Sequence, residues 1–336
     1  MTHDGPGADK RNEGASSPSP PYPAEVITNH LRGLMDPSDP QDPIGAQFIT
    51  STQETIALSG ERADPIGDAP HSPIKGIVHR YADRVLLTPH FACPAYCRFC
   101  FRRDRVGQSN VALSERELDA AIDYIRRHDE IWEVILSGGD PLMLSPARLG
   151  PLITALNAIS HVGVIRIHTR VPVTDPGRIT PSLVATLRDH DSAVYVVLHC
   201  NHAREMSQAT RDACRAIVDA GVPMLAQTVL LRNVNDNPAT LSELMRTLVR
   251  NRIKPYYLHH CDMAVGTGHF RTTLAEGQGL MRTLRGAMSG LCQPLYVLDI
   301  PGGYGKVPVG PCYLHEDGLG TNFVEDPAGE QHLYPP

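Results

Sequence analysis

The sequence predicts an α/β fold: a partial or complete TIM-like barrel of about six parallel strand–helix units, with a helical N-terminal lead-in. Short β-rich runs alternate with helical patterns, mostly about thirty residues apart, which is typical of a parallel sheet with right-handed crossovers. A doubly wound open sheet is the alternative, but no Gly-x-Gly-x-x-Gly motif follows the first run. The predicted strands are Arg84–Thr88, Glu133–Ser137, Val164–His168, Val194–His199, Met224–Leu230 and Pro255–His259.

The helices between these strands are predicted from their start and stop signals. Capping boxes, in which two side chains satisfy backbone N–H groups of the first turn, are expected at Ser114 with Glu117 and at Thr240 with Glu243. Gly221 is expected to end the helix before the fifth strand, since glycine readily adopts the left-handed conformation of a helix end. Strands and helices therefore alternate in the order that a barrel requires.

The chain divides into four predicted segments. Residues 1–23 are rich in proline, glycine, serine and charge, so we expect a disordered tail. Residues 24–78 contain amphipathic stretches broken by prolines, which indicates a helical lead-in. Residues 79–310 would form the barrel that carries the chemistry, and residues 311–336 a short C-terminal tail.

Composition excludes several classes of protein. The 336 residues are 41% hydrophobic and 20% charged, as in ordinary soluble globular proteins. A net charge of −6 gives no indication of a nucleic-acid-binding surface, so no nucleic-acid partner is expected. No run of about eighteen apolar residues or signal peptide is present, so no membrane partner is expected. Eight cysteines without an export signal favour a reducing, cytoplasmic location.

Three cysteines lie together just after the first predicted strand. Cys93, Cys97 and Cys100 form a C-x3-C-x2-C run, and clustered thiolates are the usual ligands of iron–sulfur clusters. Three ligands leave one iron of a [4Fe–4S] cluster open, and S-adenosylmethionine can bind at such an iron. A zinc site would need a fourth Cys or His nearby, and buried structural thiols rarely come as a tight triplet. The run resembles the signature of the radical S-adenosylmethionine superfamily.

A glycine pair lies just after the second predicted strand, at the same end of the expected sheet. In the sequence Ser137-Gly138-Gly139-Asp140 the glycines would let the backbone approach a ligand, and Asp140 could accept from an ammonium group. A plain tight turn is the alternative. In the superfamily, this position resembles the motif that holds the amino group of S-adenosylmethionine.

Lys306 ends a glycine-rich run that begins at Asp299 and follows an apolar stretch. A lysine on such a corner can simply be solvated. On a loop over a barrel mouth it is also placed to form a Schiff base with pyridoxal phosphate. The phosphate would then need cations, and Arg80, Tyr81 and Arg84 lie just before the cysteine run.

Taken together, these motifs make the chain similar to the lysine 2,3-aminomutase family of radical enzymes over roughly residues 64–315. The matching stretches are residues 76–85, the cysteine run, residues 136–140, 226–232 and 255–258, Asp262, residues 269–271, and residues 301–306.

The resemblance implies a role for each matching residue. It implies a [4Fe–4S] cluster, S-adenosylmethionine and pyridoxal phosphate as cofactors, and Lys306 as the catalytic lysine. The implied sites are Cys93, Cys97 and Cys100 for the cluster; Ser137, Gly138, Gly139, Asp140 and Gln227 for S-adenosylmethionine; Lys306, Arg80, Tyr81, Arg84 and His199 for pyridoxal phosphate; Arg102 for the substrate carboxylate; and Asp262 with Asp299 for its distal ammonium. Both aspartates are expected to be negatively charged at neutral pH.

The implied activity is that of an isomerase, the conversion of L-lysine to β-lysine. Three alternatives stay open: a β-lysine-forming enzyme for modification of elongation factor P, an aminomutase for arginine or ornithine, and a non-catalytic metal-binding scaffold. The expected partners are a small-molecule amino acid, an electron donor such as flavodoxin or ferredoxin, and further copies of the chain. The zinc site of well-studied relatives is expected to be absent, because Asn237 replaces one cysteine ligand and no cysteine follows Cys312.

Overall fold

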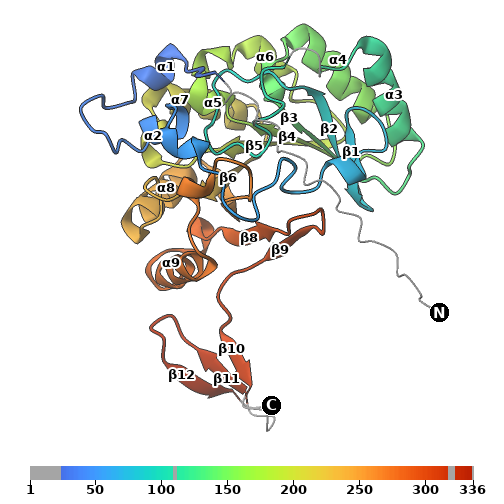
Figure 1. Ribbon diagram of the computed structural model, residues 1–336. Coiled ribbons are helices and arrows are strands. Elements are labelled where there is room, and N and C mark those ends of the chain that lie inside the picture. Colours follow the sequence, from blue (N-terminus) through green and yellow to red (C-terminus); the bar gives the residue numbers. More distant parts are fainter. Residues whose placement is uncertain (1–23, 109–111, 317–321, 335–336) are drawn as a thin grey trace, which may run out of the picture.

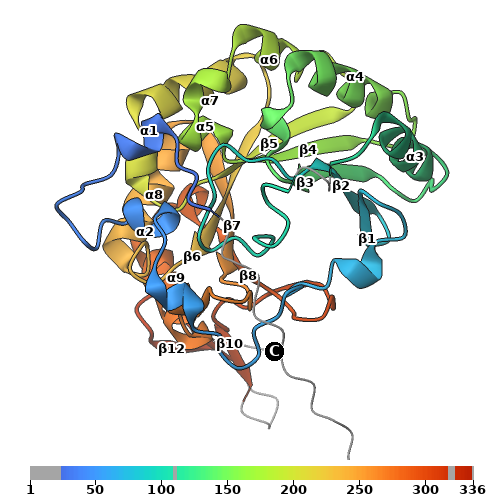
Figure 2. The ribbon, with the colours of Figure 1, turned by 45° about the horizontal axis from the view of Figure 1, so that its top comes forward.

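A computed structural model describes residues 24–108, 112–316 and 322–334. Its centre is a nine-stranded sheet whose strands follow one another in chain order, from β1 at one edge to β9 at the other. Strands β2 to β8 are parallel, whereas β1 and β9 pair antiparallel at the edges. Figure 2 shows the sheet curled into an open arc with helices on its outer side. The partial form of the predicted barrel is therefore confirmed.

All six predicted strands are present, with ends that differ by at most a few residues, and the apolar stretch before Asp299 forms a further parallel strand. The strands of the sheet are β1 Ile77–Tyr81, β2 Arg84–His90, β3 Glu133–Gly138, β4 Val164–Thr169, β5 Ala193–His199, β6 Met224–Leu230, β7 Ile253–His260, β8 Leu295–Asp299 and β9 Lys306–Pro308.

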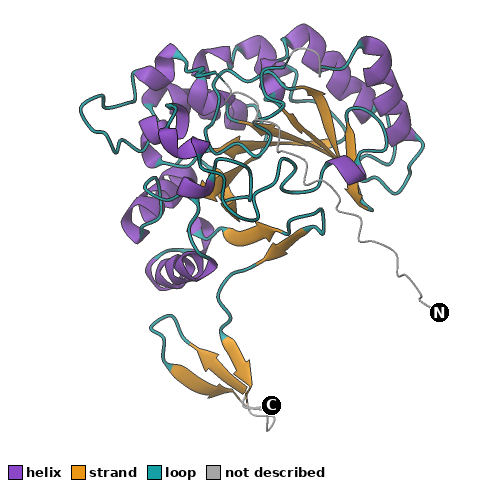
Figure 3. Cartoon of the chain, in the orientation of Figure 1, coloured by secondary structure: helices purple, strands orange, loops and turns teal. Residues whose placement is uncertain are grey.

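The longer helices cover the outer face of the sheet (Figures 1 and 3) and bury one apolar side each. In α8, for example, Leu241, Leu244, Met245 and Leu248 face inward at the spacing of an amphipathic helix. The α-helices are α1 Asn29–Arg32, α2 Gly45–Phe48, α3 Glu115–Arg126, α4 Pro146–Asn157, α5 Val171–Thr174, α6 Pro181–Ala185, α7 Gln208–Asp219, α8 Pro238–Arg250 and α9 Leu274–Ala287.

The predicted helix ends were right except at the start of α8. Ser114 and Glu117 form the expected capping box, and Gly221 follows α7 with a φ of 83°. The capping box predicted at Thr240 with Glu243 was wrong, because α8 begins earlier. Its N-cap is Asn237, whose side chain accepts from the N–H of Thr240, and Pro238 occupies the first helical position.

The N-terminal lead-in packs against the loop that contains the cysteine run. Leu31, Ile44 and Phe48 form a small apolar cluster with Ala95 of that loop. Glu54, which is 1% exposed, makes ion pairs with the loop's Arg98 and Arg103.

Short 3₁₀ helices lie between the main elements of the described residues. They are η1 Thr52–Thr55, η2 Ala69–His71, η4 Pro141–Met143, η5 Pro176–Arg178, η6 Ala203–Glu205, η7 Gly268–Phe270 and η8 Gly290–Cys292.

The two edges of the open sheet meet at Lys306. The backbone N–H of Lys306, on β9, donates to the hydroxyl of Tyr81, on β1, over 2.7 Å. Beside this contact the lead-in crosses the gap, and a Cβ on Gly67 would lie 2.4 Å from the backbone nitrogen of Gly303. The backbone therefore closes the opening with two glycines at a distance that no larger residue permits.

Beyond β9, the chain forms a separate three-stranded antiparallel sheet (Figures 1 and 3), within the segment predicted as a short C-terminal tail. Its strands are β10 Leu314–Glu316, β11 Asn322–Glu325 and β12 Gln331–Tyr334. The tail predicted for residues 1–23 lies outside the described residues. None of the helices described in this structure is long and apolar enough to span a membrane.

We predict that Gly139→Ala destabilises the protein by about 1–3 kcal/mol, the usual cost of overpacking. A Cβ at this position would lie 2.4 Å from the carbonyl oxygen of Ala92, in the cysteine loop, so the backbone would have to move. The free energy of unfolding in urea measures the effect. Gly279→Ala is the matched control, because this α9 residue has no atom within 4 Å of the added Cβ and alanine favours a helix. Equal stability of Gly139→Ala and the parent would contradict the prediction.

Candidate active site

A cavity of about 360 Å³ lies inside the arc of the sheet, and every predicted site residue lines it. The cysteine loop follows β2, the glycine pair ends β3, and Asp299 ends β8. In a parallel sheet these strand ends share one rim, which is where such folds hold ligands. The structure thus brings together Cys93, Cys97, Cys100, Ser137, Gly138, Gly139, Asp140, Gln227, Arg80, Tyr81, Arg84, His199, Arg102, Asp262, Asp299 and Lys306.

The three clustered cysteines are free thiols. Burial raises the pKa of Cys93, and it raises the pKa of Cys100 to about 12, with the neighbouring thiols adding to both rises. Thiolates in this environment therefore need a bound cation. Three free thiols that line one cavity fit an iron–sulfur cluster.

Arg170, which we did not predict, holds one of these thiols. Its side chain is buried and donates to the Cys97 sulfur over 2.9 Å, while its other terminal nitrogen pairs with Glu205 over 2.7 Å. Hydrogen bonds to ligand sulfurs are one way in which proteins tune such clusters. The available signal was a charged residue two positions after the predicted strand Val164–His168.

The glycine pair after β3 is hydrogen-bonded to the cysteine loop. The N–H groups of Gly139 and Asp140 donate to the carbonyls of His90 and Ala92 over 2.8 and 2.9 Å. The glycines are thus needed for close backbone packing, independently of any ligand.

The Asp140 carboxylate is occupied by donors from its own chain. It accepts from the Thr169 hydroxyl at 2.7 Å and from the backbone N–H groups of Arg170, Val171 and Leu142 at 2.6, 3.0 and 3.1 Å. Burial raises its pKa, and these hydrogen bonds act in the opposite direction. Asp140 therefore joins the ends of β3 and β4, and its contact with S-adenosylmethionine stays a prediction.

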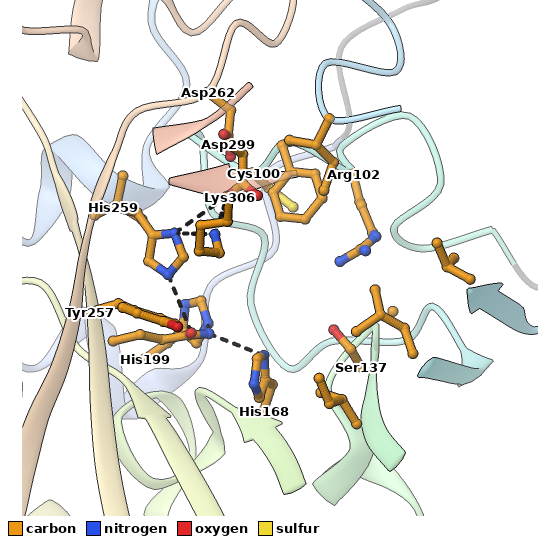
Figure 4. Close-up of a pocket in the computed structure, with 18 of the residues that line it drawn as sticks. Cys100, Arg102, Ser137, His168, His199, Tyr257, His259, Asp262, Asp299 and Lys306 are labelled. Carbon is orange, nitrogen blue, oxygen red and sulfur yellow. Dashed lines mark hydrogen bonds and ion pairs between the residues drawn. The ribbon is translucent and has the colours of Figure 1, made fainter. Parts of the chain in front are cut away.

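Lys306 reaches into the cavity and makes an ion pair with Asp299 (Figure 4). Its Nζ also lies 3.2 Å from Nδ1 of His259. The Tyr81 ring, whose hydroxyl binds the backbone of Lys306, carries the Arg84 guanidinium on its face at 3.8 Å from the ring centroid. Tyr81 and Arg84 thus lie beside the lysine that the sequence singled out.

The two predicted acidic residues differ in charge. Burial alone would raise the pKa of Asp299, but His259 and Lys306 hold it at about 2. Burial raises the pKa of Asp262 to about 7, and the charge of Asp299 adds to this rise. The expectation that both are negatively charged at neutral pH therefore holds for Asp299, whereas Asp262 is only partly ionised there, because it lacks the direct cationic partner that Asp299 has.

Arg80 and Arg102 share one carboxylate, that of Asp68 in the lead-in. Arg102 donates from Nε and a terminal nitrogen at 3.1 and 2.6 Å, and Arg80 pairs with the other oxygen at 3.1 Å. Nε of Arg80 is buried without a hydrogen-bond partner among the described residues, so it can still donate to a ligand. Asp68 was missed as a site residue, since nothing local marks it as a partner of distant arginines.

Gln227 lies among three histidines. Its side-chain nitrogen contacts His199 and lies 3.2 Å from His168, and its oxygen lies 3.4 Å from His259. Of the three, only His199 was predicted as a site residue. His168 and His259 ended predicted strands, and a polar residue at the carboxyl end of a barrel strand was the available signal.

The comparisons with known proteins agree with this geometry. The Radical SAM superfamily matches residues 87–245. The chain is 43% identical over 302 residues to L-lysine 2,3-aminomutase of Clostridium subterminale, covering 89% of this chain and 72% of that protein. It is 40% identical over 305 residues to a putative L-lysine 2,3-aminomutase of Aquifex aeolicus, covering 91% and 82%.

Another relative has a different substrate in its name. The chain is 36% identical over 299 residues to glutamate 2,3-aminomutase of Clostridioides difficile, covering 89% of this chain and 70% of that protein. Among solved structures, a radical SAM methyltransferase from Sphaerobacter thermophilus aligns over 66% of this chain and 68% of its own, with a TM-score of 0.47 and 16% identity.

The sequence identity to the curated aminomutases, over most of this chain and of theirs, decides the family. The chain belongs to the lysine 2,3-aminomutase family of radical S-adenosylmethionine enzymes.

Proposed function

We propose that this protein is a pyridoxal-phosphate-dependent amino-acid 2,3-aminomutase that converts L-lysine to β-lysine. One observation supports this proposal above the others: the cysteine triplet, Lys306 and two partly buried aspartates line the same cavity. A metal-binding scaffold without catalysis would have no use for Lys306 or for the two aspartates. The substrate is a small molecule, in keeping with the size of the cavity.

The family implies a [4Fe–4S] cluster, S-adenosylmethionine and pyridoxal phosphate. Together these groups supply radical chemistry and a covalent hold on an amino group, neither of which side chains offer by themselves. Cys93, Cys97 and Cys100 would hold the cluster, with Arg170 donating to Cys97.

The residues near Lys306 fit a phosphorylated aldehyde. Lys306 would hold the aldehyde, and its ε-amine is anchored by Asp299 while its backbone is anchored by Tyr81. Arg80 keeps a buried Nε that can still donate, and Arg84 adds a second cation. Guanidinium groups suit phosphate oxygens because they present several donors in a plane. His199 is the remaining predicted phosphate ligand, and Gln227 with Ser137–Asp140 would contact S-adenosylmethionine.

Each end of the substrate would bind a side chain of opposite charge. Arg102 uses one side of its guanidinium for Asp68, and the group faces into the cavity (Figure 4), where a carboxylate could bind. The other end of the substrate would face the Asp262 carboxylate. No described residue hydrogen-bonds to this carboxylate, and burial raises its pKa. A partly buried carboxylate without a partner favours a cationic ligand and opposes an acidic one. This favours lysine over glutamate, and it leaves arginine and ornithine as substrates to be compared in the same assay.

An anaerobic assay tests the proposal directly. The full-length protein with reductant, both added cofactors and a panel of lysine, arginine, ornithine and glutamate should convert lysine fastest, as measured by product mass and retention. Preferential turnover of glutamate, or no turnover of any of the four by protein with full cofactor content, would contradict the proposed function.

We expect Cys97→Ala to lose the iron–sulfur cluster, and with it the reductive cleavage of S-adenosylmethionine. Iron and sulfide analysis of anaerobically reconstituted protein, together with the visible absorbance of the cluster, measures this loss. Cys312→Ala is the control, because Cys312 is exposed and does not line the cavity. Parent-level iron and sulfide in the Cys97 variant would rule out the assigned cluster ligand.

Borohydride reduction in the presence of pyridoxal phosphate should attach a pyridoxyl group to Lys306, because reduction traps the imine of a lysine bound to this aldehyde. Peptide mass spectrometry locates the label. Lys254 provides an internal comparison, since its ammonium donates to the carbonyls of Leu291 and Gln293 at 2.9 and 3.0 Å. Label on Lys254 with Lys306 unmodified would transfer the role and refute the assignment.

The KM for lysine should rise about tenfold as the pH falls from about 8 to about 6. The Asp262 carboxyl has a pKa of about 7, so it is ionised above this pH and binds an ammonium group, and it is protonated below. Binding is therefore lost as the pH falls through the pKa. Steady-state kinetics of the parent and of Asp262→Asn measure this, with a raised KM and a flatter pH profile expected for the variant. Identical profiles in both proteins would show that Asp262 does not bind the ammonium.

A further inference from the structure

His259 has no role in the function proposed above, yet it lies between Lys306 and Gln227. Its Nδ1 is 3.2 Å from Nζ of Lys306 and 3.7 Å from Oδ2 of Asp299. Its Nε2 is 3.4 Å from Oε1 of Gln227. Figure 4 shows His259 facing Lys306 on one side, with His199 on the other. Both ring nitrogens therefore face functional groups of the cavity.

The hydrogen bonds of this network can have only one direction. A lysine ammonium donates and never accepts, so Nδ1 of His259 must be the acceptor. The proton of the neutral ring is then on Nε2, which donates to the carbonyl oxygen of Gln227. The amide nitrogen of Gln227 donates in turn to Nδ1 of His168 at 3.2 Å and to Nε2 of His199. In this arrangement all three histidines are neutral, and the proton of His168 is on Nε2, which is buried without a partner among the described residues.

The charged and titratable groups around His259 act in opposite directions: Lys306 favours the neutral ring and the Asp299 carboxylate favours the protonated one. They are Lys306 on β9, Asp299 on β8, His199 on β5, His168 on β4 and Tyr257 on its own strand, at 5.5 Å between ring centroids. Burial lowers the pKa of His259 to about 4 and of His199 to about 3, and it also lowers that of His168. Gln227 is uncharged and holds the His259 ring in the tautomer with a free Nδ1 lone pair.

A lysine must lose a proton before its nitrogen can attack a carbonyl carbon, and an adjacent base commonly removes it. Of the two groups beside this ammonium, Asp299 is the weaker base, since its pKa is held at about 2 whereas that of His259 is about 4. Nδ1 of His259 is within hydrogen-bond distance of the same ammonium.

We propose that His259 is a catalytic base that takes the proton of Lys306 when this lysine joins the aldehyde cofactor, and returns it when a substrate amine displaces the lysine. The inference rests on the proposed function. One N–H bond of the ammonium breaks, its electron pair stays on Nζ, and an Nδ1–H bond forms. The positive charge moves to the imidazole ring, where the Asp299 carboxylate at 3.7 Å stabilises it.

The test is the rate at which pyridoxal phosphate attaches to Lys306, followed by stopped-flow absorbance in the full-length protein without S-adenosylmethionine or substrate. His259→Gln keeps hydrogen-bonding atoms at this position but cannot act as a base. We expect its rate at neutral pH to fall by about 100-fold or more, within the usual range for general base catalysis. We also expect its rate to rise with pH, because free amine must now form in solvent, whereas the parent rate stays nearly constant between about pH 6 and about pH 8.

Two controls separate the possible outcomes. His128→Gln, which alters a histidine stacked on Tyr124 away from the cavity, should behave like the parent. In His259→Ala, added imidazole should restore the rate by occupying the vacated space. Failure of the parent to attach the cofactor at Lys306 would refute the proposed function itself.

A parent-like rate and pH profile in His259→Gln would overturn the role of His259 while leaving the proposed function intact. So would a slow His259→Ala protein that imidazole does not rescue and that never reaches the parent's final cofactor occupancy, because His259 would then be structural.

Discussion

Two buried carboxylates of the lead-in, Glu54 and Asp68, determine how the cysteine loop lies over the barrel. Glu54 pairs with Arg98 and Arg103, and Asp68 pairs with Arg102 of the same loop and with Arg80 of β1. Removing one partner of such a pair leaves a charge in a low-dielectric environment, which is costly. The loop therefore has one favourable position, and the lead-in, although it carries no ligand candidate of its own besides Asp68, is part of the construction of the site.

The open form of the sheet determines where Lys306 lies. A closed barrel would pair β1 with its last strand, but here the edges are joined by a hydrogen bond between Tyr81 and the Lys306 backbone. The gap next to this bond is covered by Gly67 against Gly303. The lysine is thus held at the meeting point of the first and last strands, with its ammonium directed to Asp299 and His259. An open arc leaves a cavity for ligands, whereas a small closed barrel is filled by its own side chains.

The carboxylates of the cavity act differently because their partners differ. Asp140 accepts four hydrogen bonds from its own chain and joins two strands. Asp299 is balanced by Lys306, whereas Asp262 has only distant cations and a pKa of about 7. Residue type alone does not distinguish these three aspartates, since each follows or ends a strand at the same rim. The hydrogen-bond partners decide which one braces the fold, which one orients the lysine and which one is open to a ligand.

The sequence by itself determined the strand order, the placement of the cysteine loop after the first parallel strand and the presence of Lys306 on a glycine-rich corner. These features depend on spacing within short segments, where apolar periodicity and glycine act locally. Only the tertiary structure showed that Asp68, Arg170, His168 and His259 belong to the site, because their partners are far away along the chain: Arg170 and Cys97 are 73 residues apart, and Lys306 and His259 are 47 apart. The start of α8 was mispredicted for the opposite reason, as two local signals competed and Asn237-Pro238 prevailed. Local chemistry determines where an element can form, whereas burial and long-range pairing decide which of its side chains carry charge, hold a proton or face a ligand.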